Sequence, residues 1–169
     1  MTKIARIDRL EPDAWERVRA VRLRALTDAP DAFGSTISGE RERPEHSWRG
    51  RLEYPSSIAL VAAQDGEDVG LAFGAPYDGK PGFAGLFGMW VAPEARGSGV
   101  SRRLVRCVID WAISQDYANL LLEVADDNKR AVAFYARMGF EPTGATGSLP
   151  APREHIREHE RVLSLTRSS

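Results

Sequence analysis

The spacing of apolar residues changes several times along this chain, from alternation in twos to the three-and-four spacing of helices. Alternation and short apolar runs predict strands at 3–10, 57–63, 69–75, 83–92, 120–124, 140–146 and 160–165. Helical spacing predicts a helix opening at Pro12 and Asp13, followed by helices over 39–53, 100–114 and from Asn128 to about Met138. Strands and helices mixed in this order predict an α/β fold.

The first predicted helix is amphipathic. Its apolar face carries four residues at intervals of four, three and four: Ala14, Val18, Val21 and Ala25. Its arginines, Arg17, Arg19, Arg22 and Arg24, fall mostly off that face, which favours a solvated surface. The alternative is that Arg22 or Arg24 contacts a substrate.

A glycine-rich turn separates the apolar run 83–92 from the helix 100–114. Pro93 stops strand pairing because it has no backbone N–H. Gly97 and Gly99 allow positive φ angles and close approach of a ligand to the backbone. The helix that follows starts with unpaired N–H groups and the positive end of its dipole. The turn is therefore a candidate phosphate site, although many such turns only end a strand.

The helix that begins near Asn128 places three residues on one face, because Asn128, Ala131 and Tyr135 are at positions i, i+3 and i+7. Gly139 follows as a C-terminal stop. By itself, a polar, a small and a tyrosine residue in a row can be an ordinary surface.

Together these motifs resemble the GNAT acyltransferase superfamily. The pattern Val-x-Pro-x-x-Arg-Gly-x-Gly spans 91–99, and Asn128, Ala131, Tyr135 and Gly139–Phe140 follow at the family's spacing. The likeness is close over 83–140 and extends by element order to most of the chain. It implies one domain over 1–169, with a mixed, twisted sheet of about seven strands flanked by about four helices.

The resemblance also implies an activity, the transfer of an acetyl group from acetyl-CoA to a primary amine by direct attack in a ternary complex. The strand 83–92 is expected to splay from its parallel neighbour and admit the pantetheine arm. The backbone of 96–102, assisted by Arg96, is expected to bind the pyrophosphate. Ser101 stands where the motif has glycine or alanine. The expected cosubstrate-binding residues are Met89, Trp90, Val91, Arg96, Gly97, Ser98, Gly99, Val100, Ser101, Arg102, Asn128 and Tyr135.

Two residues carry the expected catalysis. The resemblance makes Tyr135 the general acid at the departing sulfur. Glu123 is the candidate base, because it is the lone charge in the apolar strand 120–124 and burial would raise its pKa. His155, Glu158 or a water are the other candidates. Leu122–Glu123–Val124 with Asn128 resembles the family members that acetylate a ribosomal protein, although those continue with arginine where this chain has Ala125.

In the same family, the two early helices form a wall of the acceptor site. Phe33 and Trp48 would then line that wall, with core packing as the alternative. Family members are often dimers, which makes a homodimer the expectation for a partner besides the amine.

Composition and charge limit the kinds of partner and the cellular location to be expected. A net charge of −1 gives no general attraction to nucleic acid or anionic membranes. The chain shows no signal peptide and no apolar run near the about 20 residues that span a bilayer. The single cysteine, Cys107, suits a reducing cytoplasm and reads as a small core residue.

Parts of the sequence also fit three other functions. A dinucleotide site lacks its third glycine, because position 102 is arginine. His155–Ile156–Arg157–Glu158–His159 matches a zinc-hydrolase pattern but leaves little chain for a further ligand, so no metal is expected. A third reading is a GNAT module that binds acyl-CoA without turnover.

Overall fold

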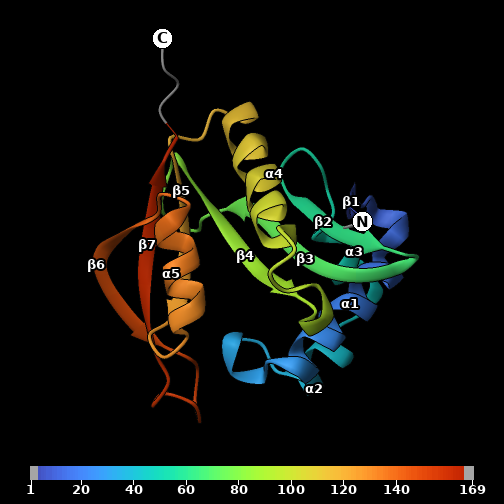
Figure 1. The fold of residues 1–169 in the computed structure, drawn as a ribbon, viewed down its shortest axis with the longest axis horizontal. Helices are drawn as coiled ribbons and strands as arrows, with labels where there is room; N and C mark the ends of the chain where they lie inside the picture. Colours follow the sequence, from blue (N-terminus) through green and yellow to red (C-terminus); the bar gives the residue numbers. More distant parts are fainter. Residues whose placement is uncertain (1–3, 166–169) are drawn as a thin grey trace.

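The computed structural model describes residues 4–165 and contains one seven-stranded mixed sheet (Figure 1). Its order is β1-β2-β3-β4-β5-β7-β6. The strands are β1 (Arg6–Arg9), β2 (Ile58–Gln64), β3 (Glu67–Pro76), β4 (Phe83–Val91), β5 (Asn119–Ala125), β6 (Glu141–Ser148) and β7 (Arg157–Ser164). The helices are α1 (Trp15–Asp28), α2 (Ile37–Arg41), α3 (Glu45–Gly50), α4 (Val100–Ser114) and α5 (Lys129–Arg137). Short 3₁₀ turns form η1 (Pro12–Ala14), η2 (Pro30–Ala32) and η3 (Pro93–Ala95).

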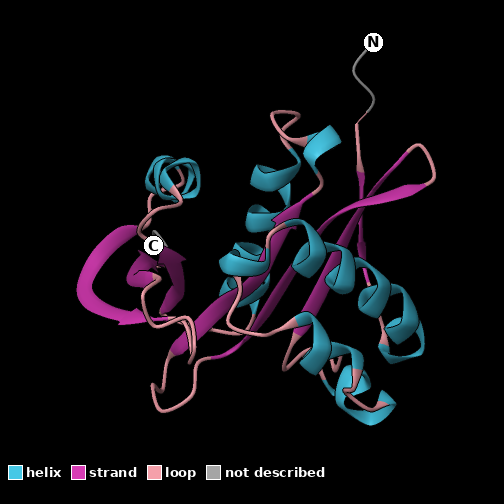
Figure 2. Cartoon of the chain, turned by 90° about the horizontal axis from the view of Figure 1, so that it is seen from below, coloured by secondary structure: helices cyan, strands magenta, loops and turns pink. Residues whose placement is uncertain are grey.

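Helices cover both faces of the sheet (Figure 2). On one face, α4 lies so close to β3 that a Cβ added at Gly70 would come within 2.9 Å of Leu104. On the other face, α1 brings Arg22 against the end of β4 at Gly88. The predicted apolar face of α1 is confirmed, because Val18, Val21 and Ala25 are buried.

The sheet opens between its two central strands. Within the described residues, β4 and β5 pair in parallel only from Phe83–Asn119 to Gly85–Leu121. Beyond Gly85, β4 continues to pair with β3 but leaves β5, and the two strands diverge in Figure 1. A bulge accompanies the divergence, because the β3–β4 register shifts between Leu71 and Phe73 and Gly88 has φ +61°. The family resemblance implied the splay, and the irregularity that glycines inside this strand predicted is found at Gly88.

Two predicted elements need correction. The helix expected over 39–53 is two short helices, α2 and α3, because Pro44 disfavours helical geometry in the residue before it and supplies no N–H. Trp48 is fully buried in the core, which decides against its lining the acceptor site. The first strand is shorter than predicted, and Ile4 lies outside it, 83% exposed.

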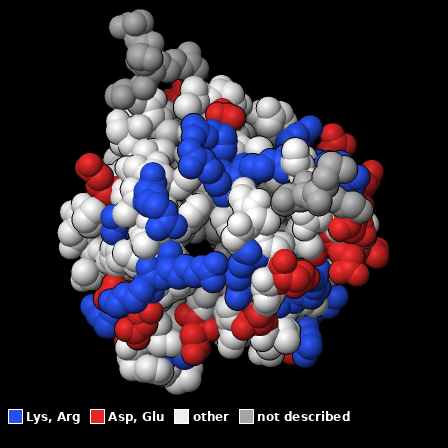
Figure 3. Space-filling model, in the orientation of Figure 1, with Lys and Arg blue, Asp and Glu red and all other residues white. Residues whose placement is uncertain are grey.

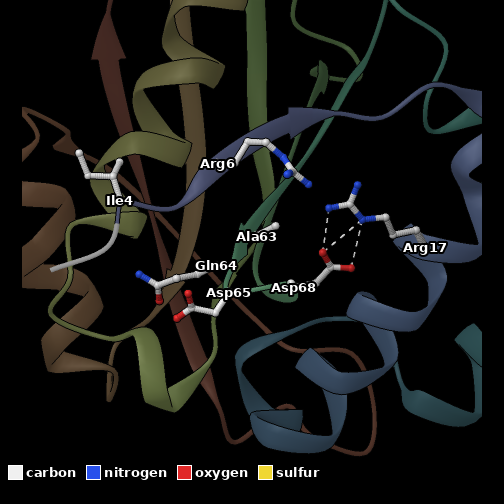
Figure 4. A pocket seen from close by; sticks show the side chains of 8 residues that line it. Ile4, Arg6, Arg17, Ala63, Gln64, Asp65 and Asp68 are labelled. Carbon is white, nitrogen blue, oxygen red and sulfur yellow. Dashed lines mark hydrogen bonds and ion pairs between the residues drawn. The ribbon is translucent and has the colours of Figure 1, made fainter. Parts of the chain in front are cut away.

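An ion-pair cluster fixes α1 to the edge of the sheet. The Arg17 guanidinium donates to both oxygens of Asp68, at 2.8–3.2 Å (Figure 4). It also donates to Asp8 at 2.9 Å. A cavity of about 570 Å³ lies beside this cluster. Because the Arg17 fork is committed to these two carboxylates, we assign it to holding α1 in place.

No helix among residues 4–165 combines the length and the apolar character needed to cross a bilayer.

Candidate active site

The turn from β4 into α4 presents backbone N–H groups that have no protein acceptor. Gly97 and Gly99 have φ angles of +80° and +88°, and Gly99 is the N-cap of α4. Two of the predicted N–H donors are used inside the turn, because Arg96 donates to Pro93 and Ser98 to Ala95, each at 3.3 Å. In this turn, the backbone N–H groups of Gly97, Gly99, Val100, Ser101 and Arg102 have no backbone acceptor among the described residues. These groups converge at the positive end of the α4 dipole.

The Arg96 side chain points back toward α1. Its guanidinium donates to Asp28 at 2.5 Å and to the Val91 carbonyl at 3.1 Å. Asp28 also accepts from the indole N–H of Trp90 at 3.0 Å, and the bonds from Trp90 and Arg96 hold the pKa of Asp28 below its usual value. The end of α1 is thereby tied to both ends of the segment 90–96.

Positive charge gathers around a hollow between α4 and α5 (Figure 3). The exposed basic residues of these two helices are Arg102, Arg106, Lys129, Arg130 and Arg137. Their charge makes this face attractive to a polyanion, although the whole chain is nearly neutral.

The polar face predicted for α5 is partly used within the helix. The Asn128 side chain accepts from the N–H of Ala131 at 3.2 Å and so caps α5. Tyr135 is buried, with its ring edge-on to Phe140 at 5.8 Å. Burial raises the pKa of the Tyr135 phenol well above its usual value of 10.0. Its hydroxyl therefore keeps its proton.

A cavity of about 960 Å³ lies where β4 and β5 separate. One wall comes from α1 and the segment 32–51, including Arg22, Phe33 and Arg51. The opposite wall comes from β5 and β7, with Glu123 and Glu158. The structure thus brings Phe33, Glu123 and Glu158 to one cavity, and a volume of this size suits a small-molecule or peptide group.

The expected burial of Glu123 is wrong. Glu123 is exposed, because its strand position faces the opening of the sheet and Leu122 and Val124 take the buried face. Its carboxylate accepts from the Tyr77 hydroxyl at 2.9 Å. Burial, together with this carboxylate, raises the pKa of Tyr77 to about 12. Tyr77 is a site residue that the sequence pattern missed, since it lies in a turn with no motif around it.

Glu158 is the carboxylate in this cavity whose environment favours the protonated form. Burial raises its pKa above the usual 4.5, and the charges of Glu123 and Asp126 add to this, whereas Arg153 acts against it. A carboxylate with a raised pKa is better matched to proton transfer near neutral pH than an ordinary one.

The third polar feature of the cavity is a cluster around Glu40, which is 1% exposed. Arg51 donates to both oxygens of this carboxylate at 3.2 Å, and Arg43 donates to one at 3.2 Å. Arg22 approaches only to 3.9 Å. The prediction of a solvated α1 arginine face therefore fails at Arg22, which is 7% exposed and turned into the cavity.

The two histidines of the pattern His155–His159 have different environments. His155 is exposed, whereas His159 Nδ1 lies 2.7 Å from Asp126 and its Nε2 accepts from Arg161 at 3.2 Å. Both ring nitrogens of His159 are thus engaged. Within 4–165, no group of three or more His, Cys, Asp or Glu residues is arranged to hold a metal ion. Cys107 packs against the core, partly buried, and burial raises the pKa of its thiol.

Comparisons with known proteins agree with this geometry. Residues 20–140 match the model of the acetyltransferase (GNAT) family. An N-acetyltransferase from Staphylococcus aureus Mu50 is similar in structure, with a TM-score of 0.77, 16% identity, and coverage of 97% of this chain and 100% of that one. The structure of yncA from Salmonella typhimurium with its cofactor acetyl-CoA has a TM-score of 0.77, 16% identity and coverage of 99% and 97%. A ribosomal-protein-alanine N-acetyltransferase from Brucella melitensis has a TM-score of 0.76, 21% identity and coverage of 94% and 99%.

Proposed function

Since the chain belongs to the acetyltransferase (GNAT) family, we propose that it transfers an acetyl group from acetyl-CoA to a primary amine of a small molecule or peptide. One observation carries the proposal. The strand β4 parts from β5 after Gly85, where residues of both strands line a cavity, and the same strand leads through η3 to the unpartnered N–H groups at the start of α4.

The residues at the start of α4 fit a diphosphate. A row of N–H groups at a helix N-terminus is a site for an anion of this kind. A Cβ added at Gly97 or Gly99 would have no protein atom within 4 Å, so the space in front of these glycines is open to a ligand. A side chain at either position would take up part of that space. We propose that Gly97 to Arg102 bind the pyrophosphate and that Met89, Trp90, Val91 and Asn128 line the path of the pantetheine arm. Arg96 supports the turn through its bond to Asp28.

Acetyl-CoA, when bound, supplies the acetyl group as a thioester. In this proposal the amine of the acceptor lies against Glu123 and Glu158, and one of these carboxylates takes its proton. A lysine-like amine needs such a base, because its deprotonation at pH 7 costs about 4.6 kcal/mol. The N–H of Met89 is the proposed donor to the carbonyl oxygen, and the Tyr135 hydroxyl the donor to the departing sulfur.

The test is the release of free thiol from acetyl-CoA in the presence of small amines, aminoglycosides or peptides, combined with calorimetric binding of CoA. We expect saturable binding and amine-dependent release with at least one class. Failure of acetyl-CoA to bind would overturn the proposal. Binding and thermal stabilisation without release for any amine would instead identify a module that binds acyl-CoA without turnover.

A further inference from the structure

Arg22 carries hydrogen-bond donors that the protein leaves without partners. Its side chain is 9% exposed, and its Nε and Nη1 are buried without a hydrogen-bond acceptor. Most buried donors in folded proteins are paired, so this guanidinium is an exception that calls for a reason. It also lines the cavity at the opening of the sheet.

The surrounding groups position Arg22 without satisfying it. Phe33 lies under the guanidinium, with 4.6 Å from Cζ to the ring centroid. The carboxylate of Glu40 stays 3.9 Å from Nε and is already bonded to Arg51 and Arg43. Three arginines therefore share one carboxylate, and this wall of the cavity keeps an excess of positive charge.

Acidic residues line another part of the cavity. Glu123 and Glu158 reach it from β5 and β7, and Asp78 reaches it from the turn after β3, whereas Arg22 comes from α1. Arg22 is also close to the opening of the sheet, because its Nη1 lies 3.3 Å from where a Cβ on Gly88 would stand. A ligand that reaches both parts meets a cation at one end and carboxylates at the other.

We propose that the acceptor amine also carries a carboxylate and that Arg22 binds it. The proposal rests on the proposed function and names the substrate class for it, an amino acid or another compound with an amine and a carboxylate. The amine end faces Glu123 and Glu158, and the carboxylate completes the Arg22 fork in the paired geometry that guanidinium groups favour. Burial lowers the pKa of Arg22 only to about 10, so it is charged when the acceptor arrives.

The test uses a series of ω-amino acids, from glycine to 6-aminohexanoate, each compared with the amide of the same chain length. We expect kcat/KM for the acid to exceed that for its amide at least tenfold at the chain length that spans the cavity. Arg22→Met should abolish this preference by slowing the acid at least tenfold while changing the amide less than threefold. Arg22→Lys should recover part of it.

Two further measurements separate binding from folding. Arg19→Gln removes a charge from the same helix at a residue that does not line the cavity, and it should leave the preference intact. The melting temperature of ligand-free Arg22→Met should equal or exceed that of the wild type, because the change removes a buried charge that has no hydrogen-bonded partner. A marked fall in melting temperature would instead mean that Arg22 serves the fold.

The outcomes distinguish this proposal from the one it rests on. If amines are acetylated but acids and amides react equally well, only the carboxylate proposal is overturned. If acetyl-CoA is not turned over with any amine, both proposals fall. If Arg22→Met instead removes a preference for succinyl-CoA over acetyl-CoA, the arginine reads the acyl group, and the acceptor proposal is wrong.

Discussion

At the scale of single residues, Tyr135 combines a buried ring with a hydroxyl that holds its proton. Full transfer of that proton to a thiolate is uphill by about 2 kcal/mol even from an ordinary tyrosine. We therefore expect Tyr135 to donate a hydrogen bond to the departing sulfur. Such a bond to a charged group contributes about 1.5–3 kcal/mol.

Tyr135→Phe should accordingly lower kcat about 10- to 100-fold and leave the Kd for CoA within twofold. Stopped-flow thiol release and calorimetry measure the two quantities. Tyr117→Phe is the matched control, because Tyr117 packs on Trp111 at 5.7 Å and does not line the site. An unchanged kcat in Tyr135→Phe would remove Tyr135 from the mechanism.

Glu158 gives a prediction in which stability and activity move in opposite directions. Because its folded-state pKa lies above the usual 4.5, the folded protein binds this proton more tightly than the unfolded chain. Stability therefore falls as pH rises from about 4.5 through the raised pKa. Glu158→Gln should raise the melting temperature at pH 7, have no such effect below about pH 4.5, and lower kcat.

Thermal melts across pH and the pH profile of kcat/KM test this. Glu154→Gln, an exposed change in the turn that leads into β7, should alter neither. A lower melting temperature for Glu158→Gln at pH 7 contradicts the raised pKa. An unchanged kcat would leave Glu123 as the base.

Residue environments were the least predictable part of the site. The apolar spacing in α1 correctly predicted that Val18 and Val21 are buried. It placed Arg22 off the apolar face, although Arg22 is buried as well. A second layer of chain, the segment 32–51, buries Arg22 from the other side, and sequence periodicity in one helix cannot report a neighbour so far along the chain. The predicted burial of Glu123 was wrong for the opposite reason, because β4 and β5 diverge beside it and leave it exposed.

At the scale of elements, α4 was predicted residue for residue, because its apolar spacing and its glycine N-cap agree. The same N-cap provides a test of the proposed pyrophosphate site. Gly99→Ala places a Cβ at φ +88°, which costs about 1–2 kcal/mol whatever the surroundings. It also places that Cβ among the free N–H groups.

Gly144→Ala is the matched control, because Gly144 has φ +93° and open space around it but lies on β6. Both variants should lose similar thermal stability. Only Gly99→Ala should raise the Kd for CoA, by tenfold or more in calorimetry. Equal affinity in the two variants would place the pyrophosphate elsewhere.

The early helices were predicted less well than α4. Trp48 and Leu52 carry the apolar spacing that suggested one helix, and both are buried. Pro44 nevertheless divides the segment, and α3 starts afresh behind it. Apolar spacing fixes which residues face the core, but it does not show that the backbone between them is continuous.

At the scale of the whole molecule, two parts of the sheet are joined through a short parallel contact. β1 to β4 form one part and β5, β7 and β6 the other, and among the residues that the structure describes they pair only over Phe83–Gly85. A ligand that fills the opening binds both parts in the folded state alone. At 100 times its Kd, it stabilises the fold by about 2.7 kcal/mol.

Hydrogen exchange should locate this effect. We expect those amides of 87–91 that face β5 rather than β3 to exchange quickly in the free protein and to be protected by acetyl-CoA, whereas those of β2, paired on both sides, stay unchanged. Mass spectrometry of peptides from the two strands measures it. Protection confined to α4 would show that the ligand stops at the turn and does not enter the sheet.

The same opening has a consequence for handling the protein. Past Gly85 on β4 and Leu121 on β5, the two strands face each other with unpaired backbone edges, and each edge can pair with an extended chain. When no ligand fills the opening between β4 and β5, a partly unfolded strand from a second molecule can pair with these edges. Concentrated stocks should therefore cloud sooner without coenzyme A than with it, and light scattering during storage would follow the difference.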